Sequence, residues 1–222
     1  MGGVLIEAQG AVPRRRPRRS WRPVLALGCA LLGAAAPAPG EPDAAPILAA
    51  APAELMEVLR DRKVVLEARG EAATQAARGF VIFEQPVDRA FLLLAQSARQ
   101  KEYRPELEAI ETLEVREDGS IDAHRMKIMF IDIRYHLRNR IDALNRRIHW
   151  ELAPGFENDL KRVEGSWELY ALEDGRTLGV FGTVVEVGSG MPSFLQDYVT
   201  RKNLPRTLER CRLWVDGNGR AP

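Results

Sequence analysis

The feature that most constrains the fold of this chain is a series of segments in which apolar and polar side chains alternate. Within residues 129–137 every second side chain is apolar: Met129, Ile131, Ile133, Tyr135 and Leu137. Polar or charged side chains hold intervening and following positions: Arg134, His136, Arg138 and Arg140. Because successive side chains of a strand point to opposite faces of a sheet, this pattern predicts a strand with one buried face and one solvated face.

Further strands are expected before and after this segment. Turn-forming compositions at residues 117–120, 154–155 and 173–175 separate the expected strands. These strands are residues 107–117, 121–142, 146–152, 166–172 and 176–187. The segment 121–142 is too long for one ordinary strand, so it is expected to bend near Asp132. The series predicts an antiparallel meander.

Helices are expected on both sides of the meander. A short helix at 53–60 and strands at 63–69 and 77–85 precede an apolar helix at 87–96. An amphipathic helix is predicted from Pro192 onward, and Pro205 is expected to kink or restart it, with Asn203 as a possible cap. The order of elements predicts an α+β helix-grip fold, in which a curved antiparallel sheet wraps around a long C-terminal helix and encloses an internal apolar cavity.

The N-terminal segment has the composition of an export signal. Residues 1–40 hold six arginines and one glutamate, followed by an uncharged stretch at 24–36 and small residues. This order predicts a signal peptide at 1–40, and the 13-residue stretch is shorter than the ~20 residues that span a bilayer. An Ala/Pro-rich linker is predicted at 41–53, a domain at 54–216 and a disordered tail at 217–222. We therefore expect a secreted or periplasmic protein.

The charge and the cysteine content exclude several classes of protein. The signal segment carries a net charge of +5, so the remainder carries −4, since the whole chain has +1. An acidic domain without zinc-finger spacing or a phosphate loop is not expected to bind nucleic acid. After removal of the leader Cys211 is the only cysteine, so the chain cannot form an intrachain disulfide and must be stabilised by packing. A monomer is expected.

Several short motifs resemble the START-like superfamily, also called SRPBCC, and within it the bacterial polyketide cyclase/dehydrase and coenzyme Q-binding families. The matching residues are 148–152 (IHWEL), 164–169 (EGSWEL), 175–177 (GRT), 191–195 (MPSFL) and 203–208 (NLPRTL). The likeness runs from about Glu54 to Val215. These motifs are diagnostic of the fold rather than of an activity.

The resemblance implies a cavity between the sheet and the C-terminal helix that holds a lipid, a quinone or a polycyclic aromatic. Such pockets bury most of a ligand against apolar walls. The candidate lining residues are Phe130, Tyr135, Trp150, Trp167, Phe181, Phe194 and Tyr198. Each of these side chains alone is as well explained by core packing, and only the set favours a pocket. Tyr135 and Tyr198 could also orient a carbonyl group.

The sequence contains no recognisable catalytic or metal-binding constellation. His124, His136 and His149 lack the spacing of zinc ligands, and no predictable nucleophile lies beside them. No cofactor is predicted. The basic face at 134–140 could make transient contact with a membrane surface, although a solvated sheet face explains it as well.

Three functions remain open. The first is an exported binding or carrier protein for a hydrophobic small molecule. The second is a cyclase or dehydratase that uses the same pocket. The third is an interaction module with a filled core. The predicted signal peptide favours the first, because polyketide intermediates are made in the cytosol on carrier proteins.

Overall fold

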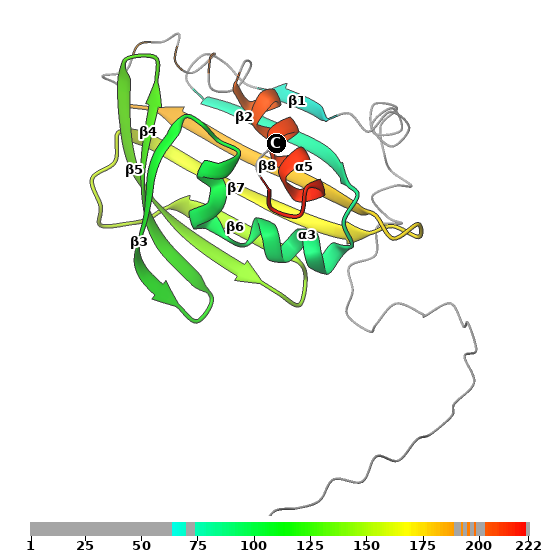
Figure 1. Ribbon diagram of the computed structural model, residues 1–222. Helices are drawn as coiled ribbons and strands as arrows, with labels where there is room; N and C mark the ends of the chain where they lie inside the picture. The colour runs from blue at the N-terminus through cyan, green and yellow to red at the C-terminus, as the bar shows by residue number, and fades with distance from the viewer. Residues whose placement is uncertain are drawn as a thin grey trace, which may run out of the picture. The chain divides into compact units, whose positions relative to one another are not determined.

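The computed structural model describes residues 64–69, 74–188, 192, 195, 198 and 203–220. The described residues form one antiparallel sheet, two α-helices and a 3-10 helix, η1 (Figure 1). The strands are β1 Val65–Arg69, β2 Thr74–Phe83, β3 Leu107–Arg116, β4 Gly119–Ile128, β5 Ile131–Asp142, β6 Arg147–Leu152, β7 Leu160–Ala171 and β8 Thr177–Val187. The helices are α3 Val87–Leu94, η1 Ser97–Glu102 and α5 Leu204–Asp216. The predicted signal peptide, linker and first helix lie outside the described residues.

The eight strands follow the order β1-β2-β8-β7-β6-β5-β4-β3, and every neighbouring pair is antiparallel. From β3 to β8 each strand pairs with the next one in the chain, as the predicted meander requires. Strand β8 pairs with β2, and this pairing joins β1 and β2 to strands β3–β8 in one sheet. Irregular register within β3, at Leu107/Ala109 and Thr112/Glu114, accompanies the bending of this edge.

The segment 121–142 is not a strand that bends near Asp132, as expected, because the chain reverses completely there. It is a hairpin in which β4 and β5 pair from Ile128↔Ile131 outward, with Met129 and Phe130 in the turn. Met129 adopts a φ of 57°, a conformation that normally favours glycine. Because a methionine and not a glycine holds this position, the sequence carries no ordinary turn signal here. The alternation within β5 itself is confirmed, because Ile133, Tyr135 and Leu137 are buried.

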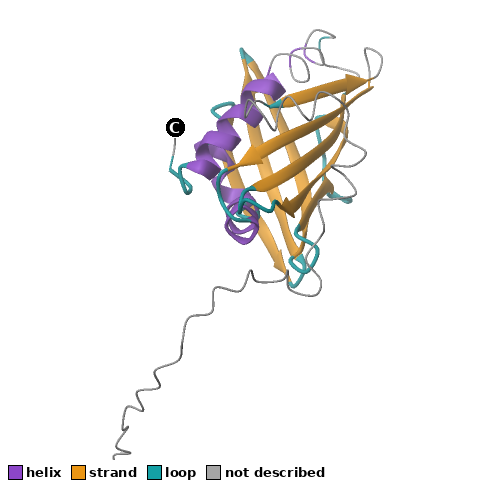
Figure 2. Cartoon of the chain, turned by 90° about the vertical axis from the view of Figure 1, so that its right-hand side faces the viewer, coloured by secondary structure: helices purple, strands orange, loops and turns teal. Residues whose placement is uncertain are grey.

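Both α-helices lie on one face of the sheet (Figure 2). Side chains from α3, α5 and strands β2, β6, β7 and β8 form the main apolar core beneath them. A second cluster gathers side chains of β4, β5 and β7 around Leu195. The two clusters share Trp150, which is packed against both. No helix among the described residues is long and apolar enough to cross a membrane.

Helix α5 begins at Leu204, and Pro205 lies in its first turn, where a missing amide hydrogen costs no helical hydrogen bond. Asn203 before it already has helical backbone angles and residues 199–202 lie outside the described residues, so a kink or a restart at Pro205 stays a prediction. Asn203 precedes the helix without capping it, because its side chain is bonded elsewhere. The part of the predicted long helix between residues 192 and 203 is largely outside the described residues.

The chain after α5 folds back at residues 217–220, within the segment 217–222 where a disordered tail was expected. The Gly219 amide donates to the Trp214 carbonyl, and the Gly219 carbonyl accepts from the Arg99 guanidinium at 2.6 Å. Arg99 also lies over the Trp214 ring, 4.9 Å from its centroid. The indole of Trp214 donates to Glu102 at 2.9 Å, so η1 is fastened to the end of α5.

A candidate ligand-binding pocket

A pocket of about 140 Å³ lies among strands β4–β8, η1 and α5. Its walls are mostly apolar, and the strands contribute most of them. The apolar lining side chains from the strands are Met126, Ile133, Leu137, Ile141, Ile148, Trp150, Leu160, Val163, Trp167, Phe181, Val185 and Val187. Leu204, Leu208 and Cys211 close the pocket from α5.

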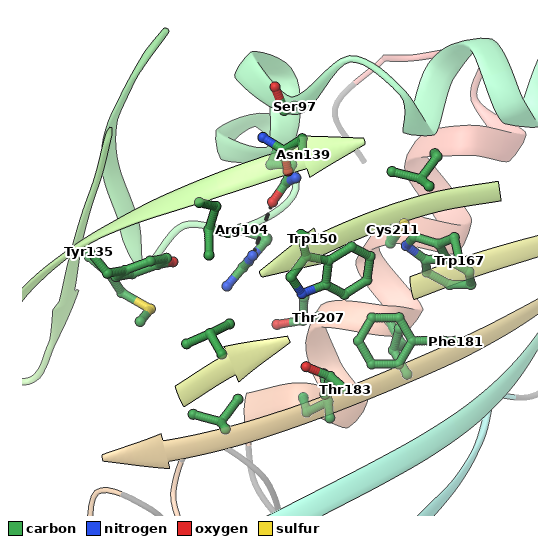
Figure 3. Close-up of a pocket in the computed structure, with 18 of the residues that line it drawn as sticks. Ser97, Arg104, Tyr135, Asn139, Trp150, Trp167, Phe181, Thr183, Thr207 and Cys211 are labelled. Carbon is green, nitrogen blue, oxygen red and sulfur yellow. Dashed lines mark hydrogen bonds between the residues drawn. The ribbon is translucent and has the colours of Figure 1, made fainter. Parts of the chain in front are cut away.

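Three aromatic rings form one side of the pocket (Figure 3). Phe181 lies between Trp150 and Trp167, with ring centroids 5.7 Å and 5.0 Å away respectively. The Trp167–Phe181 pair has an edge-to-face arrangement, and Trp167 also packs against Phe83 at 5.8 Å. Tilted and edge-to-face geometries are favourable for aromatic pairs, so these contacts stabilise this wall of the pocket.

Two strand glycines make room for these rings. A Cβ atom at Gly165 would lie 2.4 Å from both the Gly182 carbonyl oxygen and the Trp150 ring. At Gly179 a Cβ atom would lie 2.6 Å from the Phe83 ring and 3.0 Å from the Trp167 ring. A glycine inside a strand often marks such a close approach. At either position a side chain larger than that of glycine would therefore clash with the aromatic wall.

The structure brings four of the seven predicted lining residues together. Tyr135, Trp150, Trp167 and Phe181 line the pocket. Whether they contact a ligand stays a prediction.

The remaining three candidates lie elsewhere. Phe130 is 78% exposed in the β4–β5 turn, away from the pocket, because the hairpin reverses the chain there. Tyr198 is partly buried and packs against the second cluster without being among the lining residues. Phe194 lies outside the described residues. Tyr198 and Phe130 therefore do not line the pocket.

The other end of the pocket is polar and contains Arg104, which the sequence analysis did not identify (Figure 3). Its Nε donates to Glu106 Oε1 at 3.3 Å and its Nη1 donates to Gln100 Oε1 at 3.1 Å. Burial lowers the pKa of Arg104, but the attraction of Tyr135 and Glu106 outweighs this effect and raises the pKa above its ordinary value. Arg104 is therefore a permanent cation at the pocket wall.

Glu106 holds this end of the site to helix α5. Its Oε1 also accepts from Asn203 Nδ2 at 3.0 Å and from the Thr207 hydroxyl at 3.4 Å. Burial raises the pKa of the Glu106 carboxyl, but the Arg104 charge and these hydrogen bonds bring it below its ordinary value. The carboxylate is thus ionised and fixes both Arg104 and the start of α5.

A buried polar cluster lies beside this end of the pocket. Asp122 is fully buried and accepts from the Ser97 hydroxyl at 2.5 Å and from Asn139 Nδ2 at 2.8 Å. Ser97 and Asn139 both line the pocket. Next to them His124 stacks on Tyr135, with ring centroids 5.0 Å apart. Burial, followed by the charges of Arg104 and His136, lowers the pKa of His124 to about 3, so this ring is neutral at pH 7.

Two further groups at the pocket are held in their neutral forms. Burial raises the pKa of the Tyr135 phenol and raises that of the Cys211 thiol to about 12. Cys211 is therefore no nucleophile at neutral pH. Among the described residues, no group of His, Cys, Asp or Glu side chains is arranged to hold a metal ion. The site can bind and orient, and its fixed positive charge is that of Arg104.

Comparisons with known proteins identify the fold. No protein-family model and no curated protein matches the sequence. A STAR-related lipid transfer protein from Xanthomonas axonopodis is similar in structure, with a TM-score of 0.54 and 17% identity over 68% of this chain and 93% of that one. A START superfamily protein from Mycobacterium smegmatis has a TM-score of 0.51 and 16% identity over 63% of this chain and 98% of that one.

An aromatase/cyclase, Zhui from Streptomyces sp. R1128, is also similar. Its TM-score is 0.51, with 17% identity over 66% of this chain and 91% of that one. The chain therefore has the START-like fold that its sequence motifs predicted. At these identities the likeness establishes the fold alone.

Proposed function

We propose that the protein is an exported binding or carrier protein for a hydrophobic small molecule, which it holds in the pocket between the sheet and α5. The observation that carries this proposal is the lining: one wall of packed aromatic rings and aliphatic side chains, with a few polar groups gathered at one end. This is the composition of a small-molecule site, in which apolar area supplies affinity and a few polar groups orient the ligand.

The pocket volume bears on the size of the ligand. An apolar cavity of roughly 150 Å³ accommodates benzene. The 140 Å³ pocket therefore holds about one ring with small substituents, and a quinone, a lipid or a polycyclic aromatic needs its walls to move apart. The names of two structural neighbours, a lipid transfer protein and an aromatase/cyclase, favour ligands of this general class.

Binding is tested by calorimetry with a panel of neutral quinones, fatty alcohols and aromatics of one to three rings. We expect saturable binding at one site. Thr183→Phe should abolish it, because Thr183 lines the pocket and the new ring would fill it. Thr112→Phe, the same change at an exposed position of β3, is the matched control and should bind as the wild type does. Binding unaffected by Thr183→Phe would exclude this pocket.

Export is tested separately. The arginine-rich segment followed by an uncharged stretch and small residues supports cleavage between about residues 38 and 51. N-terminal sequencing of protein from a periplasmic or secreted fraction should return a start in that range. Recovery of the protein with Met1 intact and only in the cytosol would contradict export.

A cyclase or dehydratase using the same pocket is the second candidate. It is favoured by Tyr135 and Arg104, a phenol and a cation that could polarise a carbonyl group of a bound molecule. Turnover of a polycarbonyl compound by the purified protein, lost in Tyr135→Phe, would favour this candidate over a carrier.

A further inference from the structure

The pocket contains one charged side chain among otherwise neutral walls. Of the described residues that line it, Arg104 alone carries a charge at neutral pH. We propose that the natural ligand is a compact apolar acid, with one aromatic or similarly rigid body and a single carboxylate, and that Arg104 binds this carboxylate. The inference rests on the proposed function and specifies the chemical class of the ligand.

Arg104 has unused capacity to donate hydrogen bonds. A guanidinium has five N–H donors, and the side chain of Arg104 uses Nε and one hydrogen of Nη1 for Glu106 and Gln100. The Tyr135 phenol also forms a side-chain hydrogen bond with the guanidinium, so two of the five N–H donors remain unused, and 24% of the side chain is exposed. Because the side chain lines the pocket, the unused donors are available to a ligand there.

Glu106 is the counter-ion of Arg104 but does not itself line the pocket. Its side chain is only 9% exposed, so a ligand in the pocket meets the guanidinium and not the carboxylate. The oxygen that faces Arg104 is shared with Asn203 and Thr207. Glu106 therefore orients the guanidinium while its own charge is partly satisfied by two other donors.

The neighbours of Arg104 suit an oxyanion as well. Tyr135 has a phenol on the same side of the pocket, and its raised pKa keeps that hydroxyl protonated and able to donate. Thr207 and Asn203 add further polar groups near α5. The described lining contains no carboxylate that would repel an acid. Cationic ligands are disfavoured, because they would lie against Arg104 without a counter-charge.

The balance of solvation explains why an acid should be preferred over a neutral analogue. A carboxylate that leaves water for an apolar pocket loses strong hydration unless charged donors replace it. Charge-assisted hydrogen bonds to a guanidinium are about twice as strong as neutral ones and can be bidentate. A neutral ligand would not replace the hydration of the remaining guanidinium donors as well as a carboxylate would. Both effects favour the acid.

The test compares two ligands of equal size, 4-ethylbenzoate and 4-ethylbenzyl alcohol, by calorimetry at pH 7. We expect the wild type to bind both, and to bind the acid about tenfold more tightly or better. The key variant is Arg104→Met with Glu106→Gln. It removes both charges together, and the new amide oxygen can still accept from Asn203 and Thr207. Circular dichroism should show a wild-type spectrum if this variant folds.

The double variant should lose the preference for the acid, so that the acid and the alcohol bind it with similar affinities. Arg134→Met is the matched control, because Arg134 is an exposed arginine on the solvated face of β5 and its loss should leave the preference unchanged. Equal affinities of the wild type for the two ligands would overturn the inference and leave the proposed function standing. A preference that survives in the double variant would overturn the role of Arg104. Binding of neither ligand would overturn both proposals.

Discussion

Trp167 packs against core aromatic residues and also lines the pocket. The substitution Trp167→Ala therefore measures how much this side chain contributes to the free energy of unfolding. The side chain is 7% exposed and packs against Phe83 and Phe181 at centroid distances of 5.8 Å and 5.0 Å. Replacing a large core aromatic residue by alanine costs about 3–5 kcal/mol. The value should lie near the lower end, about 3 kcal/mol, because one side of Trp167 already borders the pocket and lacks protein contacts there.

Urea unfolding followed by far-ultraviolet circular dichroism measures this loss, since the signal does not depend on the tryptophan removed. For a domain of this size about 3 kcal/mol corresponds to a fall in Tm of roughly 6–12 °C. Phe130→Ala is the matched control, because Phe130 is 78% exposed and its loss should change the free energy of unfolding by less than about 0.5 kcal/mol. A loss below about 1 kcal/mol for Trp167→Ala would refute the packing argument.

Three further changes follow from particular contacts. Between pH 6.5 and 3 His124 is protonated in the unfolded chain but not in the folded chain, so the free energy of unfolding should fall on acidification. In His124→Phe this fall, measured by urea titrations at pH 7 and pH 5, should be smaller. Gly165→Ala should cost about 1–3 kcal/mol by overpacking, whereas Gly182→Ala, whose Cβ would have only a 3.8 Å contact, should cost far less in thermal unfolding. Trp214→Phe loses the Glu102 hydrogen bond and should lower the free energy of unfolding by about 1–2 kcal/mol in urea titrations.

The sequence pattern predicted the inner faces of the strands well, because a period of two depends only on the chain itself. Ile133, Tyr135 and Leu137 lie on the buried face of β5, and Trp167 and Leu169 lie on that of β7. The meander was confirmed for the same reason, because alternation and turn composition are local signals, whereas the START-like fold was expected from the resemblance of the short motifs.

The turn and the polar end of the pocket could not be predicted. The hairpin between β4 and β5 uses Met129 at a positive φ, so sheet pairing rather than a turn-forming residue fixes its place. Arg104 follows η1 in a segment without periodicity, and its role depends on Glu106, Asn203 and Thr207, two of which lie about a hundred residues away. Only the folded chain brings these groups to one site.

The measurement that tests the pocket most directly is a titration of the ¹⁵N-labelled protein with 4-ethylbenzyl alcohol, followed at the tryptophan indole N–H signals. Trp150 and Trp167 line the pocket, whereas Trp214 packs from α5 against Tyr103 and bonds to Glu102 of η1, outside the lining. A ligand in the pocket should shift the Trp150 and Trp167 signals in a saturable manner, and the Trp214 signal much less. Binding that leaves the Trp150 and Trp167 signals unchanged, or no binding at all, would contradict the account.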